Sequence, residues 1–451
     1  MTASTLPPIA TEPAPAYAPV SQPRVVWPHW QRVLFRFFAI YLTLQVSPWE
    51  WLGRIPFVAI VFRPYDRFID WLVRESNARL FHVRETLVLP NGSGDTSWAW
   101  TQMWLFLTIA VIGTVVWSVL DRKRPNYSRA AYWLRTITRF YVAFAALSYG
   151  LIKVFSLQMS FPTLSNLSTP LGDLLPMRLS WLFIGYSTKY QMFSGLAETV
   201  AGLLLLPRRT VTLGLFVAFG AFLNVFLINI AYDVPVKLYA GHLLLACTFL
   251  LVLDAPRLCR LFVFNKPVTG TALYDPPYSG KKFRYAGYVA KAYIVWFFFL
   301  MPGYGAYGRW KTPVRPAVPL TAGIYDVRLF VRNGDTIPNI PSDSIRWRDV
   351  VIDNPGGGSV GSTDTLFWQR YRRGYFRYRA DTAKHTLAMW RTSFRQDSAG
   401  ILTARYEIPD TNSARLWGKM GRDSVYMELA RSPRHFQLAE RQFHWVSEYN
   451  R

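Results

Sequence analysis

Seven residues whose side chains could take part in chemistry lie in or beside long apolar segments in the middle of the chain. They are Tyr149, Lys153, Glu198, Asn229, Asp233, Lys237 and His242. An ionisable side chain inside a membrane-spanning segment is costly, so such a residue is by default a candidate for function. Tyr149 stands four residues before Lys153, which places both on one face of a helix. We interpret the seven as one polar pocket, in which Lys153 or Lys237 neutralises Glu198 or Asp233.

The same residues could instead hold helices together. Buried ion pairs and Asn hydrogen bonds fix the packing of membrane helices, and the small residues Gly195 and Gly202 beside Glu198 let helices approach closely. Sequence alone leaves the ligand pocket and the packing role open.

Several other chemistries do not fit the residues present. A bis-histidine haem needs two histidines in the membrane, and only His242 is well placed. The two cysteines, Cys247 and Cys259, are too far apart to pair within one straight helix. The chain has no Walker or Rossmann glycine motif and no predicted metal site. Asp95, in a glycine-containing loop, is expected to form part of a plain turn.

Apolar segments predict about seven transmembrane helices within a membrane domain of residues 29–308. Residues 101–120 and 210–232 contain no charged side chain, and about twenty apolar residues are enough to cross a bilayer core. Residues 64–83 have apolar side chains at helical spacing between charged ones, which predicts an amphipathic helix on the outer membrane face. The predicted spans are residues 32–48, 101–120, 133–156, 187–206, 210–232, 236–254 and 285–302.

Charge predicts the orientation of these spans. The 451-residue chain has a formal net charge of +24, and the connections 121–135, 207–209 and 254–284 are rich in Lys and Arg. Basic loops stay in the cytoplasm. We therefore expect a bacterial inner-membrane protein with a cytoplasmic N-terminus and a periplasmic C-terminal domain. Much of the positive charge then serves to orient the protein in the membrane. The lipid bilayer is the expected partner, and no nucleic-acid partner is expected. The proline-rich residues 1–28 resemble a disordered cytoplasmic tail, not a signal peptide.

The C-terminal part, residues 309–451, has a different periodicity. Apolar and polar residues alternate in 324–332 and 401–408, with similar stretches near 344–352, 375–380, 386–394 and 425–429. Short alternating segments separated by turn residues are typical of an antiparallel β barrel or sandwich. We expect a barrel that is closed by a segment near residues 436–445. Arginines in the run 370–379 are expected on the solvent-facing side of a strand.

Spans three to six resemble the DoxX family of bacterial membrane proteins over about 120 residues. The matching residues are Arg139, Gly150-x-x-Lys153, Gly195-x-x-Glu198-x-x-x-Gly202, Arg208-Arg209, Gly214 and Asn229 through His242. The resemblance implies a four-helix membrane core and a link to quinone or thiol redox chemistry, as in thiosulfate:quinone oxidoreductase subunits. A looser likeness to vitamin K-dependent carboxylase-like proteins would make Lys153 or Lys237 a candidate base.

These observations lead to two hypotheses about function. The first is a redox-associated membrane component that binds a quinone-like or other lipophilic ligand in the polar pocket, in the outer half of the membrane. The alternative is a non-enzymatic scaffold or assembly factor whose β domain binds a periplasmic or membrane protein. The sequence identifies no catalytic residue and leaves open whether the protein is an enzyme.

Overall fold

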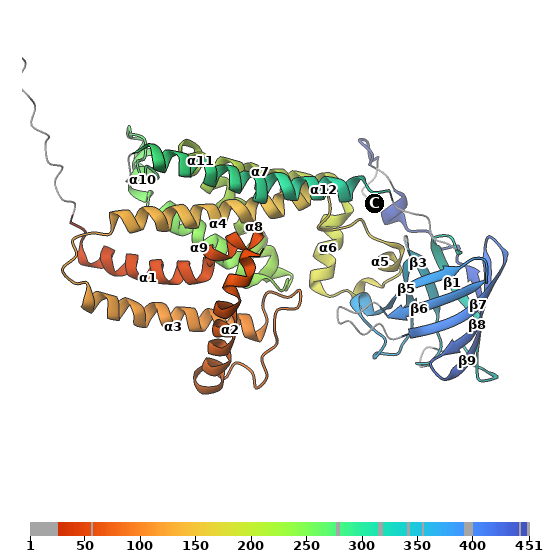
Figure 1. The fold of residues 1–451 in the computed structure, drawn as a ribbon. Coiled ribbons are helices and arrows are strands. Elements are labelled where there is room, and N and C mark those ends of the chain that lie inside the picture. The colour runs from red at the N-terminus through yellow and green to blue at the C-terminus, as the bar shows by residue number, and fades with distance from the viewer. Residues whose placement is uncertain are drawn as a thin grey trace, which may run out of the picture.

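The computed structural model describes residues 26–55, 57–276, 280–313, 319–340, 343–353, 356–391, 400–441 and 443–448. These residues form a helical domain and a C-terminal β domain that lies beyond one end of the helices (Figure 1). Residues 1–25, most of the predicted disordered tail, are outside the described part, as are residues 392–399, on which the end of one predicted strand falls.

All seven segments predicted as spans are helical. Among the described helices, four are long and apolar enough to cross a membrane: α3 (Ser97–Leu120), α4 (Ser128–Val154), the segment Arg208–Ala231 that includes α8 (Val211–Ala231), and the continuous segment Lys281–Lys311. The bent pair of α9 (Lys237–Val252) and α10 (Ala255–Phe262), with 73° between its parts, makes a fifth if it counts as one span. The longer helices are α1 (His29–Val46), α2 (Val58–Ser76), α3 (Ser97–Leu120), α4 (Ser128–Val154), α6 (Pro176–Tyr186), α7 (Thr188–Leu204), α8 (Val211–Ala231), α9 (Lys237–Val252), α10 (Ala255–Phe262), α11 (Lys281–Val295) and α12 (Met301–Lys311).

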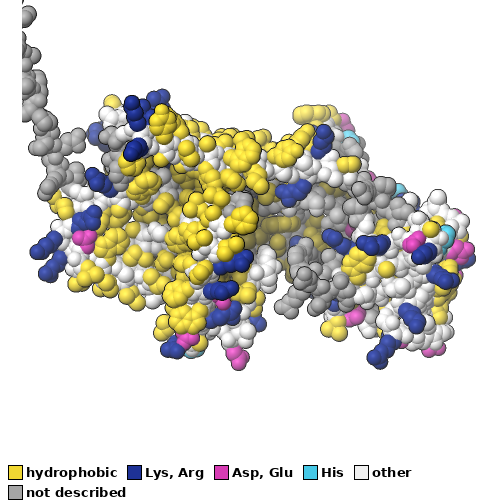
Figure 2. Space-filling view, in the orientation of Figure 1, with side chains coloured by type: hydrophobic (Ala, Val, Ile, Leu, Met, Phe, Trp, Pro, Cys, Tyr) yellow, Lys and Arg dark blue, Asp and Glu magenta, His cyan; other side chains and the backbone are white. Residues whose placement is uncertain are grey.

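Helix α4 is the centre of the helical domain, because it packs against α1, α7, α9 and α12. Its buried face is rich in small residues, among them Ala143, Ala145 and Ala146, which let the neighbouring helices come close. On other helices of the domain, large apolar side chains such as Val115 and Val119 of α3 and Phe193 of α7 are exposed on the outer surface. Hydrophobic side chains cover most of the visible helical domain (Figure 2), while Lys and Arg lie mainly at the helix ends, on α2 and over the β domain. An apolar outer surface of this kind is compatible with a membrane protein.

The predicted amphipathic helix is present as α2, which starts at Val58 and continues through a π-helical turn at Asn77–Phe81. It runs across the direction of the other helices (Figure 1). Phe68 and Trp71 on α2 are exposed, and the Trp98 indole donates a hydrogen bond of 2.8 Å to Asp70. The start of α3 is therefore attached to α2.

The C-terminal domain is a closed antiparallel barrel of eight strands. Its order is β1-β3-β4-β5-β6-β7-β8-β9, and β9 pairs with β1 to complete the ring, while the two-residue β2 lies beside β1. Alternate side chains, such as Tyr325, Val327, Phe376 and Met389, fill the interior. The strands are β1 (Gly323–Arg332), β2 (Asp335–Thr336), β3 (Asp349–Asp353), β4 (Gly357–Gly361), β5 (Gly374–Asp381), β6 (Thr386–Arg391), β7 (Gly400–Asp410), β8 (Ser413–Met420) and β9 (Asp423–Arg431).

The prediction that residues 436–445 close the barrel is wrong. The described part of that segment contains the short helix α13 (Gln437–Glu440), and the closing strand is β9. The hairpin that joins β8 to β9 brings β9 antiparallel to β1, so each of the eight barrel strands already has a neighbour on both sides before residue 436.

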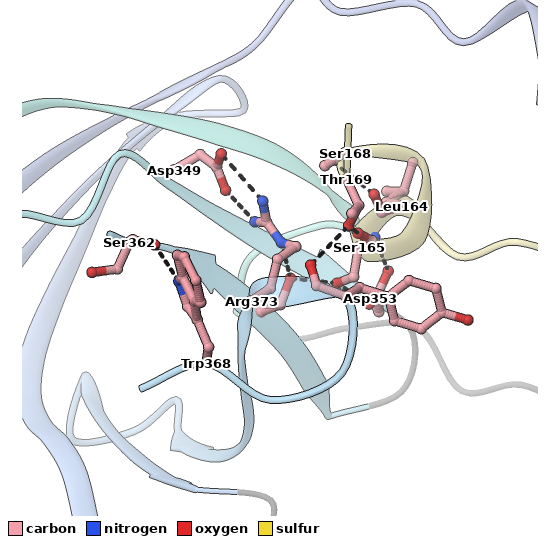
Figure 3. A network of polar contacts seen from close by, with 11 residues as sticks. Leu164, Ser165, Ser168, Thr169, Asp349, Asp353, Ser362, Trp368 and Arg373 are labelled. Carbon is pink, nitrogen blue, oxygen red and sulfur yellow. Dashed lines mark hydrogen bonds and ion pairs between the residues drawn. The ribbon is translucent and has the colours of Figure 1, made fainter. Parts of the chain in front are cut away.

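A buried polar network attaches the barrel to the helical domain (Figure 3). Ser165, in the short helix α5 (Leu164–Leu167), donates through its hydroxyl to Asp353 at 2.5 Å and accepts from the Ser359 hydroxyl at 2.7 Å. Arg373 donates to Ser359 at 2.7 Å and forms an ion pair with Asp349. Burial raises the pKa of the Asp353 carboxyl, and the hydrogen bonds from Ser165 oppose that shift. The network therefore depends on Ser165 as donor and acceptor at once.

The Ser165→Ala variant should loosen this attachment. Removal of the hydroxyl takes one hydrogen bond from the Asp353 carboxyl and leaves the Ser359 hydroxyl without its acceptor, at a cost of about 1–3 kcal/mol. Faster amide hydrogen exchange in residues 162–169 is the expected result. Ser168→Ala is the matched control, because the Ser168 hydroxyl at the end of α5 donates to Leu164 O at 2.7 Å and to no other described residue. Equal exchange in the two variants would contradict this role.

Candidate functional site

Lys153 on α4 and Glu198 on α7 form a buried ion pair. Glu198 is only 2% exposed. The helices cross closely at this point because Gly150 and Gly195 face each other. A Cβ on Gly195 would lie 2.5 Å from Val154 N and 2.7 Å from Gly150 O, so a larger residue would force the helices apart. The two halves of the sequence motif, Gly150-x-x-Lys153 and Gly195-x-x-Glu198, therefore meet in space.

One oxygen of this pair has no partner. Glu198 Oε2 is buried and accepts no hydrogen bond from a described residue. Tyr149, one helical turn before Lys153 on α4, lies within electrostatic range of Glu198. The ring centroid of Tyr149 is 5.9 Å from that of Tyr239 on α9. Tyr149 therefore lies between the ion pair and α9, with an electrostatic interaction on one side and a ring contact on the other.

Asp233 and Lys237 form a second, separate contact at the start of α9. Lys237 Nζ donates to Asp233 at 2.7 Å and lies 3.6 Å from Asp95. Asp95 also accepts from the backbone N–H groups of Lys237 and Leu238 at 2.8 and 2.9 Å. Asp95, expected to be part of a plain turn, therefore caps α9 from the loop before α3.

His242 lies in a third contact, with Tyr41 of α1. Its Nδ1 is 2.7 Å from Leu238 O, and its Nε2 is 2.7 Å from the Tyr41 hydroxyl. Since a carbonyl only accepts, Nδ1 carries the proton, and Nε2 of the neutral ring accepts from Tyr41. Asn229 Nδ2 donates to Val236 O at 3.3 Å and so fixes the turn between α8 and α9.

The structure therefore distributes the seven predicted residues over separate contacts along α4, α7, α8 and α9. Two pairs form among them, Lys153 with Glu198 and Lys237 with Asp233, whereas Asn229 and His242 contact other residues. In the part of the chain that the structure describes, none of the seven lines either of the two cavities considered next. Their contacts are those of residues that fix helices against one another.

A cavity of about 460 Å³ lies next to these contacts, between the end of α1, the start of α3, the second half of α4 and the start of α9. Its polar lining includes Gln45, Gln102, Tyr141, Ser148 and Tyr239. None of these five side chains forms a hydrogen bond with another described residue. Groups that could bind a ligand thus converge on one space.

The remaining wall of the cavity is mainly aromatic and aliphatic, but it also includes Ser47 and the acidic Glu50. Phe144 and Phe298 stack with ring centroids 3.8 Å apart, and Trp51 meets Phe144 edge to face at 4.9 Å. Sequence reasoning missed this site because it followed ionisable groups within the predicted spans, and Glu50 lies just beyond the first of them. The signal inside the spans was uncharged: Gln45 and Gln102 are amides there, where an unpaired amide is costly.

A second hollow, of about 570 Å³, lies between α6, the start of α7 and the C-terminal segment that includes α13. Most of its lining is apolar, for example Leu179, Leu182, Phe183 and Leu438. Within the described residues no cluster of His, Cys, Asp or Glu is arranged for a metal ion, and Cys247 and Cys259 are free thiols.

The Glu198→Gln variant should be strongly destabilised. It leaves the Lys153 ammonium buried without a counter-charge, which typically costs about 3–5 kcal/mol. A double variant, Lys153→Met with Glu198→Leu, should recover most of the loss because it removes both charges and keeps the volume. Thermal unfolding in detergent measures both. If the double variant is no more stable than the single one, the pair does not act by mutual neutralisation.

Comparison with known proteins gives one informative relative. No family model and no solved structure matches the chain. The uncharacterised protein YwoB of Bacillus subtilis (strain 168) is 32% identical over 124 residues, which cover 28% of this chain and 79% of YwoB. The helical and β domains together extend well beyond the matched length. The chain belongs to the same protein family as YwoB.

Proposed function

We propose that this protein is a bacterial inner-membrane protein of DoxX type that binds a quinone-like lipophilic compound in the cavity between α1, α3, α4 and α9. The observation that carries the proposal is the convergence on one largely aromatic space of side chains that form no hydrogen bond with another described residue: Gln45, Gln102, Tyr141, Ser148 and Tyr239. A quinone offers a flat ring for the aromatic side chains and two carbonyl oxygens for the donors.

The position of the cavity supports a ligand that arrives through lipid. Ser148 and Tyr141 lie six and thirteen residues before the end of α4, so the polar lining extends about 9–20 Å from that end at 1.5 Å per residue. Both distances fall within the apolar part of the helical domain. The volume of about 460 Å³ suits a ring with part of a lipid tail.

The membrane arrangement is part of the same proposal. Seven spans, α1, α3, α4, α7, α8, α9 and the segment α11–α12, would cross the bilayer, with α2 on its outer surface. The basic connections at 121–135 and 254–284 favour a cytoplasmic position for that end of the helices. The barrel, beyond the other end (Figure 1), would then be periplasmic.

The DoxX assignment rests on the motif residues that meet in the structure. Gly150, Lys153, Gly195 and Glu198 all lie at one crossing of α4 with α7. We infer that this crossing holds α4 in the position where its face with Tyr141 and Ser148 lines the cavity. Lys153 and Glu198 would then position the site without contacting the ligand.

Titration of the full-length protein in nanodiscs with decylubiquinone tests the proposal. Wild type should bind, and Gln102→Leu and Tyr239→Phe should each weaken binding by up to about tenfold, because each loses one hydrogen bond worth about 1 kcal/mol. Thr108→Val is the matched control on α3, since the Thr108 hydroxyl bonds only to Trp104 O of its own helix at 2.9 Å. A wild-type protein that binds no quinone, or variants that bind like the control, would count against the site.

The scaffold alternative also has a specific observation in its favour. Arg377, Arg379, Arg405 and Lys419 on β5, β7 and β8 are exposed and form no ion pair with a described residue, so this barrel face carries uncompensated positive charge. An acidic partner would suit it. Co-purification from cells with Arg377→Glu and Arg405→Glu substitutions tests this function; an unchanged set of partners would contradict it.

A further inference from the structure

Arg139 on α4 is a buried arginine at the end of the helical domain that lies away from the barrel. It is 4% exposed and stands eleven residues into α4, about 16 Å from the helix start at 1.5 Å per residue. A charge at this depth in an apolar domain is expensive unless its surroundings compensate it.

Among the described residues, Arg139 contacts two aromatic rings and forms no side-chain hydrogen bond. The guanidinium carbon lies 4.6 Å from the ring centroid of Phe140 and 5.5 Å from that of Tyr274. Cation–π contacts use the faces of the guanidinium, whereas its N–H bonds point outward in the plane. Arg139 Nε is buried and has no hydrogen-bond partner among the described residues.

Arg135 repeats the same situation one helical turn earlier. Its Nε is also buried without a partner in the described structure, and the intervening Thr138 has a buried hydroxyl without one. Residues four apart lie on the same helix face, so two arginines point to one region. Arg208, at the start of the segment that leads into α8, adds another positive charge within electrostatic range of Arg139.

No carboxylate of the described residues forms an ion pair with Arg135 or Arg139. Asp254 belongs to the same end of the domain, but Arg257 holds both of its oxygens, and Thr212 donates to one of them. Burial raises the pKa of Tyr274 to about 12, so its hydroxyl is neutral near pH 7 and provides no counter-charge.

Arg36 of α1 shows how this protein satisfies a buried arginine when it uses protein groups alone. Arg36 is 1% exposed and lies at the same end of the domain. It donates to the Tyr127 hydroxyl at 2.9 and 3.0 Å, to the Ser118 hydroxyl at 2.9 Å and to Asp121 O at 3.0 Å. The lack of a partner for the buried Nε atoms of Arg135 and Arg139 among the described residues is therefore a property of their site, not of buried arginines in this fold.

We propose that Arg135 and Arg139 form a binding site for a phosphate group. A phosphate has several acceptor oxygens, and two guanidinium groups can bind it through paired hydrogen bonds. Arg135 is only half-buried, so the site can be reached from the surface at the start of α4. This surface would meet the headgroup layer of a membrane, where a basic pocket between helices suits a phospholipid headgroup. A soluble phosphate would use the same chemistry.

Native mass spectrometry of delipidated, full-length protein tests the site with two lipids that differ in the phosphate. Dioleoyl phosphatidylglycerol should stay bound to wild type about tenfold better than to Arg139→Met, whereas dioleoylglycerol, which lacks phosphate, should not distinguish them. Arg122→Gln is the control for net charge, because Arg122 is exposed at the same end. It should retain the phospholipid like wild type.

Inorganic phosphate gives the second arm. If the ligand is a free phosphate, adding it to lipid-free protein should raise the thermal unfolding temperature of wild type but not of Arg139→Met, relative to chloride at equal ionic strength. If Arg139→Met does not fold, the same two measurements are made on Arg135→Gln, which changes a half-buried side chain. The proposal is overturned if neither phosphatidylglycerol nor phosphate distinguishes wild type from these variants.

Discussion

A charge buried among apolar helices needs compensation, and the charges on α4 organise the helical domain around this requirement. Lys153 finds Glu198 on α7, and that ion pair fixes how the two helices cross. The crossing is possible only because Gly150 and Gly195 leave room for the backbones. Charge and small residues thus work together: the glycines permit the approach, and the ion pair makes any larger separation costly.

The position of α4 in turn determines what lies on its other faces. Toward α1, α3 and α9, its residues Tyr141, Phe144 and Ser148 form one wall of the cavity. On the opposite side of the cavity, α9 is fixed in position by the Asp95 cap and by the contact of His242 with Tyr41. Residues that the sequence predicted to form one polar pocket, such as Lys153, Glu198 and His242, therefore hold the helices around a different cavity nearby. Their hydrogen-bonding groups are largely occupied, whereas Gln45, Gln102, Tyr141, Ser148 and Tyr239 in the cavity form no side-chain hydrogen bond with another residue that the structure describes.

The two ends of the molecule use polar groups differently. At the barrel end, Ser165, Asp353 and Ser359 satisfy one another, so a buried polar contact attaches two domains without leaving an isolated charge. At the other end, Arg36 donates four hydrogen bonds to protein groups, while the buried Nε atoms of Arg135 and Arg139 have no partner among the described residues. Arg36 shows that protein groups can compensate a buried arginine in this fold. Buried groups without such partners, such as Arg135 and Arg139, are therefore the better candidates for ligand contacts.

The sequence by itself predicted that the seven long apolar segments and the α2 region are helical, that the C-terminal part is a β structure, and that Lys153 and Glu198 are candidate functional residues; it did not predict α6. These properties follow from local periodicity and from the cost of charge in apolar surroundings, both of which can be read along the chain. Only the tertiary structure decided that Lys153 meets Glu198, that Asp95 caps α9, that β9 and not residues 436–445 closes the barrel, and that Gln45 and Gln102 face one cavity. Such pairings depend on how helices and strands far apart in sequence approach one another, and no local pattern encodes that approach.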